Sequence, residues 1–206
     1  MSLGTLYIIS APSGAGKTSL VKKLVATLEN VRVSVSHTTR ARRPNERESL
    51  DYYFVTRKQF EMMKKSGEFL EYAQVFDNYY GTCRSAVVNQ LNQGKDVILE
   101  IDWQGARQVR NHRLDCCSIF ILPPSRADLE KRLHGRGQDT DENIQRRMRD
   151  ADKEMQHYSE FEYIVINDSF DQALNDLKSI FAAQRLKLAA QRQRHQHLFN
   201  TLFATS

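Results

Sequence analysis

The sequence predicts an α/β fold in which a parallel sheet carries helices on both faces. Apolar strands and amphipathic helices alternate along the 206 residues, and the stretches between strands are long enough to hold a helix, as parallel pairing requires. The stretch at residues 96–101 is an apolar strand that closes in acids, and residues 118–122 form another apolar strand; such runs are typical of strands buried on both sides. The hydrophobic content of 40% suffices for a core.

The periodicity of apolar residues places each element in order. Alternating valines indicate a strand at residues 31–35, whereas the leucines and valines of residues 18–28 fall on one helical stripe. The predicted strands are residues 5–10, 31–35, 52–55, 69–76, 96–101, 118–122 and 163–166. The predicted helices are residues 18–28, 85–93, 126–134, 141–158 and 171 onward. Ser169 and Gln172 have the spacing of a capping box and predict the start of the last helix.

Composition excludes several classes of protein. The mean hydropathy is -0.58, and no apolar run reaches the length of about eighteen residues that a membrane helix needs. The N-terminus lacks the basic start of a signal peptide, so we expect a cytoplasmic protein without a membrane partner. Cys83, Cys116 and Cys117 lack metal-ligand spacing and are expected to be reduced thiols.

The net charge of +5 has its source in the C-terminal tail. No acidic residue follows Asp176, whereas five Lys and Arg side chains do. The charges of the remaining chain balance, and its core lacks the aromatic stacking motifs of nucleic-acid binding. We therefore expect no nucleic-acid partner.

Residues 11–18 read Ala-Pro-Ser-Gly-Ala-Gly-Lys-Thr and lie between a predicted strand and a predicted helix, as a Walker A phosphate-binding loop does. Backbone N–H groups would hold phosphate oxygens, Lys17 would meet the β and γ phosphates, and Thr18 would ligate Mg²⁺. Ala11 replaces the first glycine of the pattern, which requires that its φ be negative. These features predict a P-loop NTPase core. The residues expected to bind ATP here are Ser13, Gly14, Ala15, Gly16, Lys17, Thr18 and Ser19.

Two acids, Glu100 and Asp102, close the strand at residues 96–101 and resemble the Walker B acids that hold Mg²⁺ or its water shell. Thr18 and Glu100 are the expected metal ligands. Acids at strand ends are also common in ordinary loops, so this pair alone is an ambiguous signal.

A basic loop follows the second strand. Residues 36–44 read Ser-His-Thr-Thr-Arg-Ala-Arg-Arg-Pro, which combines hydroxyls with guanidiniums that bind a dianionic phosphate through two parallel hydrogen bonds. A solvated basic surface is the alternative interpretation. The neighbouring phosphate loop favours a second phosphate site.

Seven blocks run in order over most of the chain: SAPSGAGKTSL, SVSHTTRARRP, DYYFV, GEFLEYAQVFDNYYGT, ILEIDWQGARQV, PPSRADLEKRLHGRG and VIND. In these blocks the sequence resembles the guanylate kinase family of P-loop nucleoside monophosphate kinases. The resemblance implies ATP-dependent phosphorylation of GMP, and of dGMP, by direct in-line transfer with Mg²⁺ as cofactor. It departs from the family at His37, where a hydroxyl is common, and at Glu100, which is one methylene longer than the frequent Asp.

The resemblance implies a single domain over residues 1–206 that is built from distinct parts. A small GMP-binding region would be inserted at residues 34–87, and a helical lid would span residues 125–157. The basic extension at residues 185–206 lies beyond the blocks and is a candidate for homo-oligomer contacts. The core would comprise residues 1–33, 88–124 and 158–184.

The resemblance also implies site residues. Those expected to bind the GMP phosphate are Arg40, Arg43, Tyr52 and Tyr80, and those expected to read guanine are Ser36, Glu71, Thr82 and Asp102, while the role of Glu100 towards Mg²⁺ or guanine stays open. The charge of the transferring phosphoryl group would be neutralised by Lys17 with the lid arginines Arg132, Arg136 and Arg147. Asn167 would lie near the adenine of ATP.

Two other functions fit parts of this pattern. A guanylate-kinase-like scaffold would bind phosphorylated peptides without catalysis, but it would be expected to lose the phosphate-loop residues that this chain retains. A P-loop kinase of a sugar phosphate would keep the loop, but it would have no use for Glu71 and Asp102, because its substrate has no guanine edge.

Overall fold

The core is a sheet of five parallel strands in the order β2-β7-β1-β8-β9. This computed structural model describes residues 4–75, 77–112, 115–135 and 141–204. The predicted α/β fold with a parallel sheet is confirmed. In spatial order the strands are β2 (Val31–Val33), β7 (Asp96–Glu100), β1 (Leu6–Ser10), β8 (Cys116–Leu122) and β9 (Tyr163–Ile166).

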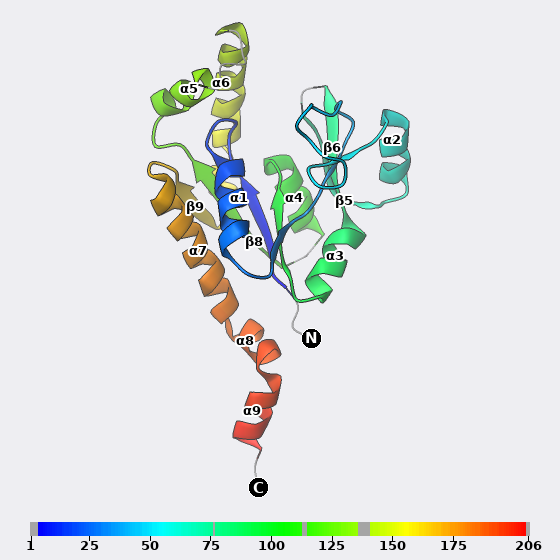
Figure 1. Cartoon of the computed structure of the whole chain (residues 1–206), viewed down its shortest axis with the longest axis vertical. Coiled ribbons are helices and arrows are strands. Elements are labelled where there is room, and N and C mark those ends of the chain that lie inside the picture. The colour runs from blue at the N-terminus through cyan, green and yellow to red at the C-terminus, as the bar shows by residue number, and fades with distance from the viewer. Residues whose placement is uncertain (1–3, 76, 113–114, 136–140, 205–206) are drawn as a thin grey trace.

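Helices cover both faces of this sheet (Figure 1). Successive residues of a strand point to opposite faces, so Tyr7 and Ile9 pack with the helices of one face, and Leu6 and Ile8 with those of the other. The Tyr7 ring stacks on Phe181 with centroids 3.6 Å apart. The first face carries α1 (Lys17–Thr27) and α7 (Phe170–Leu186), and the second carries α3 (Arg84–Asn92) and α4 (Trp103–Asn111).

A second sheet, in the order β4-β3-β6-β5, is inserted between β2 and α3. The helix α2 (Arg57–Lys65) covers it through the buried Phe60, which stacks on Phe69 with centroids 4.5 Å apart. Both the strands and the helix therefore share one small aromatic core. The strands are β3 (His37–Thr38), β4 (Tyr53–Phe54), β5 (Phe69–Val75) and β6 (Asn78–Cys83).

Two helices, α5 (Arg126–His134) and α6 (Asp141–Met155), rise above the end of the main sheet where β1 stops (Figure 1). We call them the α5–α6 pair. A separate hydrophobic cluster holds them together, and α6 leads through the short 3₁₀ helix η1 (Tyr158–Glu160) into β9. The buried members of the cluster are Leu129, Leu133, Ile144, Met148 and Ala151.

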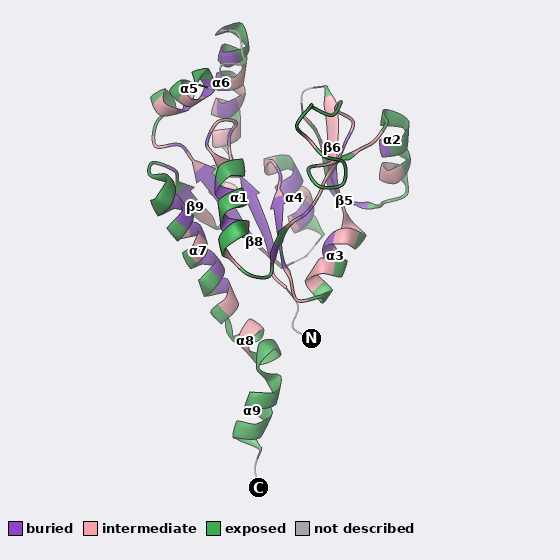
Figure 2. Cartoon of the chain, in the orientation of Figure 1, coloured by how far each residue is buried: buried purple, intermediate pink, exposed green. Residues whose placement is uncertain are grey.

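The C-terminal extension leaves the body at the opposite end of the sheet. The backbone at Lys187 is extended, with φ −55° and ψ 141°, and separates α7 from α8 (Leu188–Arg194) and α9 (Gln196–Phe203). Arg185 anchors the start of this segment, because its Nε donates to Asp96 Oδ2 at 2.9 Å. Figure 2 shows α9 exposed along its length.

Several local predictions need correction. The helices α2 and α4 and the strands β3 and β6 were not predicted. Ser169 precedes α7 but forms no side-chain capping bond, so the predicted capping box is wrong there. The capping box lies instead at the start of α2, between Thr56 and Gln59. The three cysteines are free thiols, as predicted. In the described part of the chain, no helix combines the length and apolarity that crossing a membrane requires.

Candidate active site

The turn between β1 and α1 has the backbone of a phosphate-binding loop. Gly14 and Gly16 have φ of 95° and 97°, in the left-handed region that glycine adopts readily. Gly16 precedes α1 without a side-chain capping bond, so the first N–H groups of the helix remain available to an anion. Among the described residues other than glycine, Asn30 and Ser49 have positive φ. Ala11 therefore meets the predicted condition for replacing a glycine.

Asn167 supports this loop from behind. The residue is buried, and its Nδ2 donates to the Ala15 carbonyl at 2.7 Å. A Cβ on Gly16 would collide with that nitrogen, so a side chain there would displace the amide. Asn167, at the end of β9, thus fixes the loop backbone through a contact that spans most of the sequence.

The α5–α6 pair contacts the loop directly. Arg132 Nη2 donates to the Asn167 carbonyl at 2.8 Å, and Arg147 Nη2 donates to Ser13 Oγ at 2.7 Å. A Cβ on Gly14 would lie 2.9 Å from side-chain atoms of Leu129 and Leu133, so the pair rests on the loop. The structure therefore brings Arg147 to the loop and Arg132 to Asn167, which supports the loop. Arg136 lies outside the described residues.

Sequence reasoning missed one acid at this loop. The Ser13 N–H donates to Glu154 Oε2 at 3.2 Å. Burial raises the pKa of Glu154 to about 6, although the Ser13 N–H and the charge of Lys17 act in the opposite direction. The spacing of seven residues from Arg147 places Glu154 on the same face of α6, which is the only local signal that pointed to it.

The two acids after β7 lie beside the loop. Glu100 pairs in register with Ile9, the penultimate residue of β1, so both strands deliver their ends to the same edge. Asp102 caps α4, because its Oδ1 accepts the Gly105 N–H at 2.9 Å. Gln104 Nε2 donates to the other oxygen of Asp102 at 3.1 Å. A large part of the hydrogen-bonding capacity of Asp102 is therefore used within its own helix.

A buried carboxylate of the second sheet, that of Glu71, faces helix α4. Glu71 is 3% exposed and accepts hydrogen bonds from the hydroxyl and the backbone N–H of Thr82. Burial raises the pKa of Glu71 to about 7; the Thr82 hydrogen bonds oppose the rise and the Asp102 charge adds to it. Ser36 Oγ lies 3.1 Å from Thr82 Oγ1. Three of the residues predicted to read guanine thus form one hydrogen-bonded group.

Helix α4 fits against this group because of a glycine. A Cβ on Gly105 would lie 2.6 Å from Glu71 Oε2, so a side chain there would collide with the carboxylate. Gln108 fixes the contact by accepting the Tyr72 N–H at 3.1 Å and donating to the Tyr72 carbonyl at 2.6 Å. Neither Gly105 nor Gln108 was predicted, although both lie in the block that contains Asp102.

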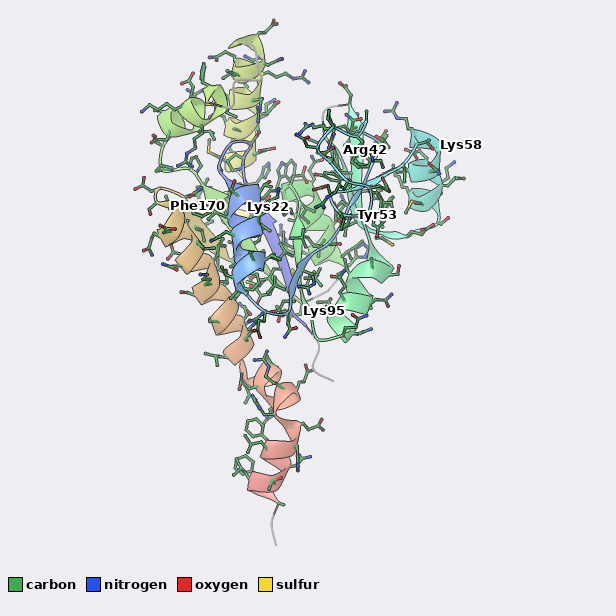
Figure 3. The ribbon with its side chains drawn as sticks, viewed as in Figure 1. Lys22, Arg42, Tyr53, Lys58, Lys95 and Phe170 are labelled. Atoms are coloured by element: carbon green, nitrogen blue, oxygen red, sulfur yellow. The ribbon has the colours of Figure 1, made fainter. Side chains whose placement is uncertain are left out.

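The predicted phosphate ligands also lie in the second sheet, since the register of β3 and β4 sets Tyr52 level with Ser36 and Tyr80 lies two residues before Thr82 on β6. Arg40 is paired with Glu46 at 2.6 Å, which raises the Arg40 pKa, and its guanidinium lies 5.5 Å from the Tyr52 ring centroid. The rings of Tyr52 and Tyr80 meet edge to face, with centroids 5.9 Å apart. Arg43 is exposed, and its backbone N–H donates to Glu46 at 2.9 Å. Figure 3 shows Arg42 of the same loop in the region of the second sheet.

Charges near the phosphate loop act on the residues of the second sheet. Lys17 and Asp102 both act on the pKa of Glu71, and they act on that of Glu154 as well. The charge of Glu100 raises the pKa of Tyr52 in addition to the larger effect of burial. The phosphate loop, the acids after β7 and the polar group of the second sheet therefore border one common site.

The chain matches a family model described as guanylate kinase over residues 3–184. It is 58% identical to the guanylate kinase of Alkalilimnicola ehrlichii over 188 residues, which cover 91% of this chain and 93% of that protein. It is 53% identical to the guanylate kinase of Yersinia pestis over 206 residues, with coverage of 99% and 100%. The crystal structure of guanylate kinase from Anaplasma phagocytophilum superposes with a TM-score of 0.79 at 32% identity, covering 100% of this chain and 98% of that one.

Proposed function

Because this chain belongs to the guanylate kinase family, we propose that the site binds ATP at the phosphate loop and GMP at the second sheet. The chain is a nucleoside monophosphate kinase that transfers the terminal phosphoryl group of ATP to GMP, a reaction of purine nucleotide metabolism. One observation carries the assignment of ATP to the loop and of GMP to the second sheet. The phosphate loop and the buried Glu71 group border the same site. We extend the proposal to dGMP, which presents the same guanine edge and the same phosphate to these residues.

The Glu71 group fits the hydrogen-bonding edge of guanine. Guanine has donors at N1 and at the 2-amino group, which an ionised Glu71 would accept, and an acceptor at O6, which a hydroxyl would satisfy. We assign that edge to Glu71 with Ser36, Thr82 and Asp102. Adenine presents the opposite pattern and would leave the buried carboxylate without donors, which is the kind of mismatch that polar sites reject strongly.

The aromatic and basic residues of the second sheet fit the GMP phosphate. Arg40 and Arg43 would supply the positive charge, and the hydroxyls of Tyr52 and Tyr80 would supply further donors. Glu46 holds the side chain of Arg40 and the backbone of Arg43, so it would position both arginines before the nucleotide arrives.

The transfer requires charge neutralisation more than covalent chemistry. A phosphate oxygen of GMP forms a bond to the γ phosphorus of ATP, the bond from that phosphorus to the bridging oxygen breaks, and ADP leaves with its electrons. Lys17, Arg132 and Arg147 would stabilise the negative charge along this line, as would Arg136. A phosphate nucleophile is already ionised and needs no general base.

The donor set beside the loop fits Mg²⁺. The hydroxyl of Thr18, in the first turn of α1, and the carboxylate of Glu100, at the end of β7, are the hard oxygen ligands that this ion prefers. We propose that Thr18 and Glu100 hold Mg²⁺ together with the phosphates of ATP. The ion would neutralise charge on the β and γ phosphates.

The C-terminal extension carries exposed apolar side chains on α9. The exposed fractions of Leu198, Leu202 and Phe203 on α9 are 53%, 63% and 73%. We propose that this face joins subunits and that the chain works in the cytoplasm without nucleic acid. Light scattering of the full chain and of Phe203→Glu tests the subunit contact, which equal masses at the monomer value would exclude.

An acceptor panel tests the function. A coupled assay would measure ADP release in the presence of ATP and Mg²⁺, with GMP, AMP, CMP, UMP or a sugar phosphate as the acceptor. We expect fast turnover with GMP and not with the other acceptors. Comparable turnover with the sugar phosphate would favour the sugar kinase, and no turnover with any acceptor would favour the phosphopeptide scaffold.

A further inference from the structure

One face of α6 holds Ser13 at two points. Arg147 donates to the Ser13 hydroxyl at 2.7 Å, and Glu154 accepts the Ser13 N–H at 3.2 Å. Residues seven apart lie on the same side of a helix, so both side chains reach the loop from one face. One positively charged and one negatively charged side chain therefore form hydrogen bonds with the same loop residue.

Glu154 lies among groups that serve the triphosphate. The charged groups that act on it are Lys17 at the start of α1, Asp102 before α4 and Asp150 on its own helix. Arg147 reaches the same loop residue. Lys17 attracts the carboxylate, whereas both aspartates repel it. Since burial raises its pKa only to about 6, Glu154 is mainly ionised at neutral pH.

This arrangement conflicts with a bound triphosphate. The phosphate oxygens of ATP seek the N–H groups of the loop and the charge of Lys17, which are the groups that Glu154 already contacts or attracts. A carboxylate and a phosphate at close range repel each other, and one N–H cannot serve both fully. Either the carboxylate moves away or the nucleotide binds against its charge.

We propose that Glu154 is an affinity-determining residue of the ATP side, whose carboxylate occupies the Ser13 N–H in the empty protein and is displaced from it by the triphosphate. The inference rests on the proposed function, in which this loop binds ATP. Displacement removes one of the two described contacts by which α6 holds Ser13 and leaves the other, from Arg147, in place.

Titration calorimetry of ATP without GMP tests the proposal on the intact chain. Glu154→Gln keeps an acceptor for the N–H but removes the charge, and we expect it to bind ATP about three- to tenfold more tightly than the wild type. Asp152→Asn is the matched control: Asp152 lies on the same helix, carries the same charge and pairs with Arg126 at the surface, 3.1 Å away. Its ATP affinity is expected within about twofold of the wild type.

A pH series separates charge from shape. The advantage of Glu154→Gln is expected to shrink as the pH falls from 8 to 5, because the wild-type carboxyl then becomes neutral itself. Titration of ATP affects both proteins equally and cancels in their ratio. Glu154→Ala repeats the comparison without an acceptor, and circular dichroism confirms that each variant is folded.

Three results would overturn the proposal. One is an unchanged or weaker ATP affinity in both Glu154 variants, another is an equal gain in Asp152→Asn, and the third is an advantage that does not vary with pH. Weakening seen only with Mg²⁺ would assign Glu154 to the water shell of the metal instead. Failure of the proposed function is distinguishable, because a wild type that binds ATP but does not phosphorylate GMP leaves this binding comparison intact.

Discussion

GMP affinity is expected to depend on pH through Glu71. The carboxyl is 3% exposed, and its pKa in the empty protein is raised to about 7 by burial. Only the ionised form accepts both donors of guanine, since a protonated carboxyl would turn a donor towards them. GMP must therefore bind to the fraction of molecules in which Glu71 has lost its proton.

The pKa of Glu71 sets the size of the effect. With a pKa of about 7, the requirement for ionised Glu71 weakens GMP binding about elevenfold at pH 6, about twofold at pH 7 and by about a tenth at pH 8. The direction is fixed, because the pKa is raised and the bound form is ionised. Acidic solution must weaken binding.

The assay compares the wild type with Glu71→Gln, because the GMP phosphate gains its second charge in the same pH range. Fluorescence titration of GMP from pH 5.5 to 8.5 gives both affinities, and their ratio removes the contribution of the phosphate. We expect the wild type to gain about tenfold on the variant between pH 6 and pH 8. A ratio that stays constant, or that rises towards acid, would refute the role of an ionised Glu71.

Further predictions follow from the loop, from the packing of α4 and from the buried acid. Lys17→Ala is expected to lower kcat at least about a thousandfold with the fold intact, whereas the exposed Lys22→Ala, on the same helix (Figure 3), keeps wild-type turnover; rates within tenfold for the Lys17 variant would contradict this. Asn167→Ala leaves a buried loop carbonyl without its donor and is expected to raise the KM for ATP about tenfold or more while sparing that for GMP; equal changes in the two values would oppose a role at the loop. Gly105→Ala places a methyl 2.6 Å from Glu71 Oε2 and is expected to weaken GMP at least about tenfold without affecting ATP, as paired titrations would show. The pKa of Glu71 in the folded protein lies above the ordinary value of 4.5, so the folded protein holds a proton that the unfolded chain releases. The free energy of unfolding therefore falls as the pH rises from about 4.5 to about 7. Urea unfolding should show the wild type losing stability relative to Glu71→Gln over that window, and parallel curves would argue against burial of the charge.

The main sheet was predictable because its strands carry their signal locally. Buried parallel strands such as β7 and β8 contain uninterrupted apolar runs, at residues 97–99 and 119–122, and the glycines and lysine of the phosphate loop follow β1 at fixed spacing. The short strands and helices were harder to predict from the sequence. Asp77 and Asn78 resemble a turn, yet Asn78 begins β6, because pairing with β5 overrides the local preference.

The helices α2 and α4 are nine residues long, and the apolar face of each is too short to give a strong local signal. Phe60 is the buried residue of α2, and α4 buries small residues, among them Gly105. What holds α4 in place is the cap from Asp102 and its contact with a strand distant in sequence. Glu154 was missed for a similar reason, since its partner Ser13 is 141 residues away. Such contacts depend on the finished fold.

The separate core of the α5–α6 pair has a consequence for local stability. Among the residues that the structure describes, five buried side chains hold the pair together, whereas the clusters on the two faces of the main sheet contain sixteen and eleven. A unit with its own small core can open without disturbing the larger ones. Amide hydrogens of α5 and α6 should therefore exchange with solvent much faster than those of β1 or β8, and as a group. In the proposed kinase, this cooperative opening would set how often the loop becomes accessible to incoming nucleotide.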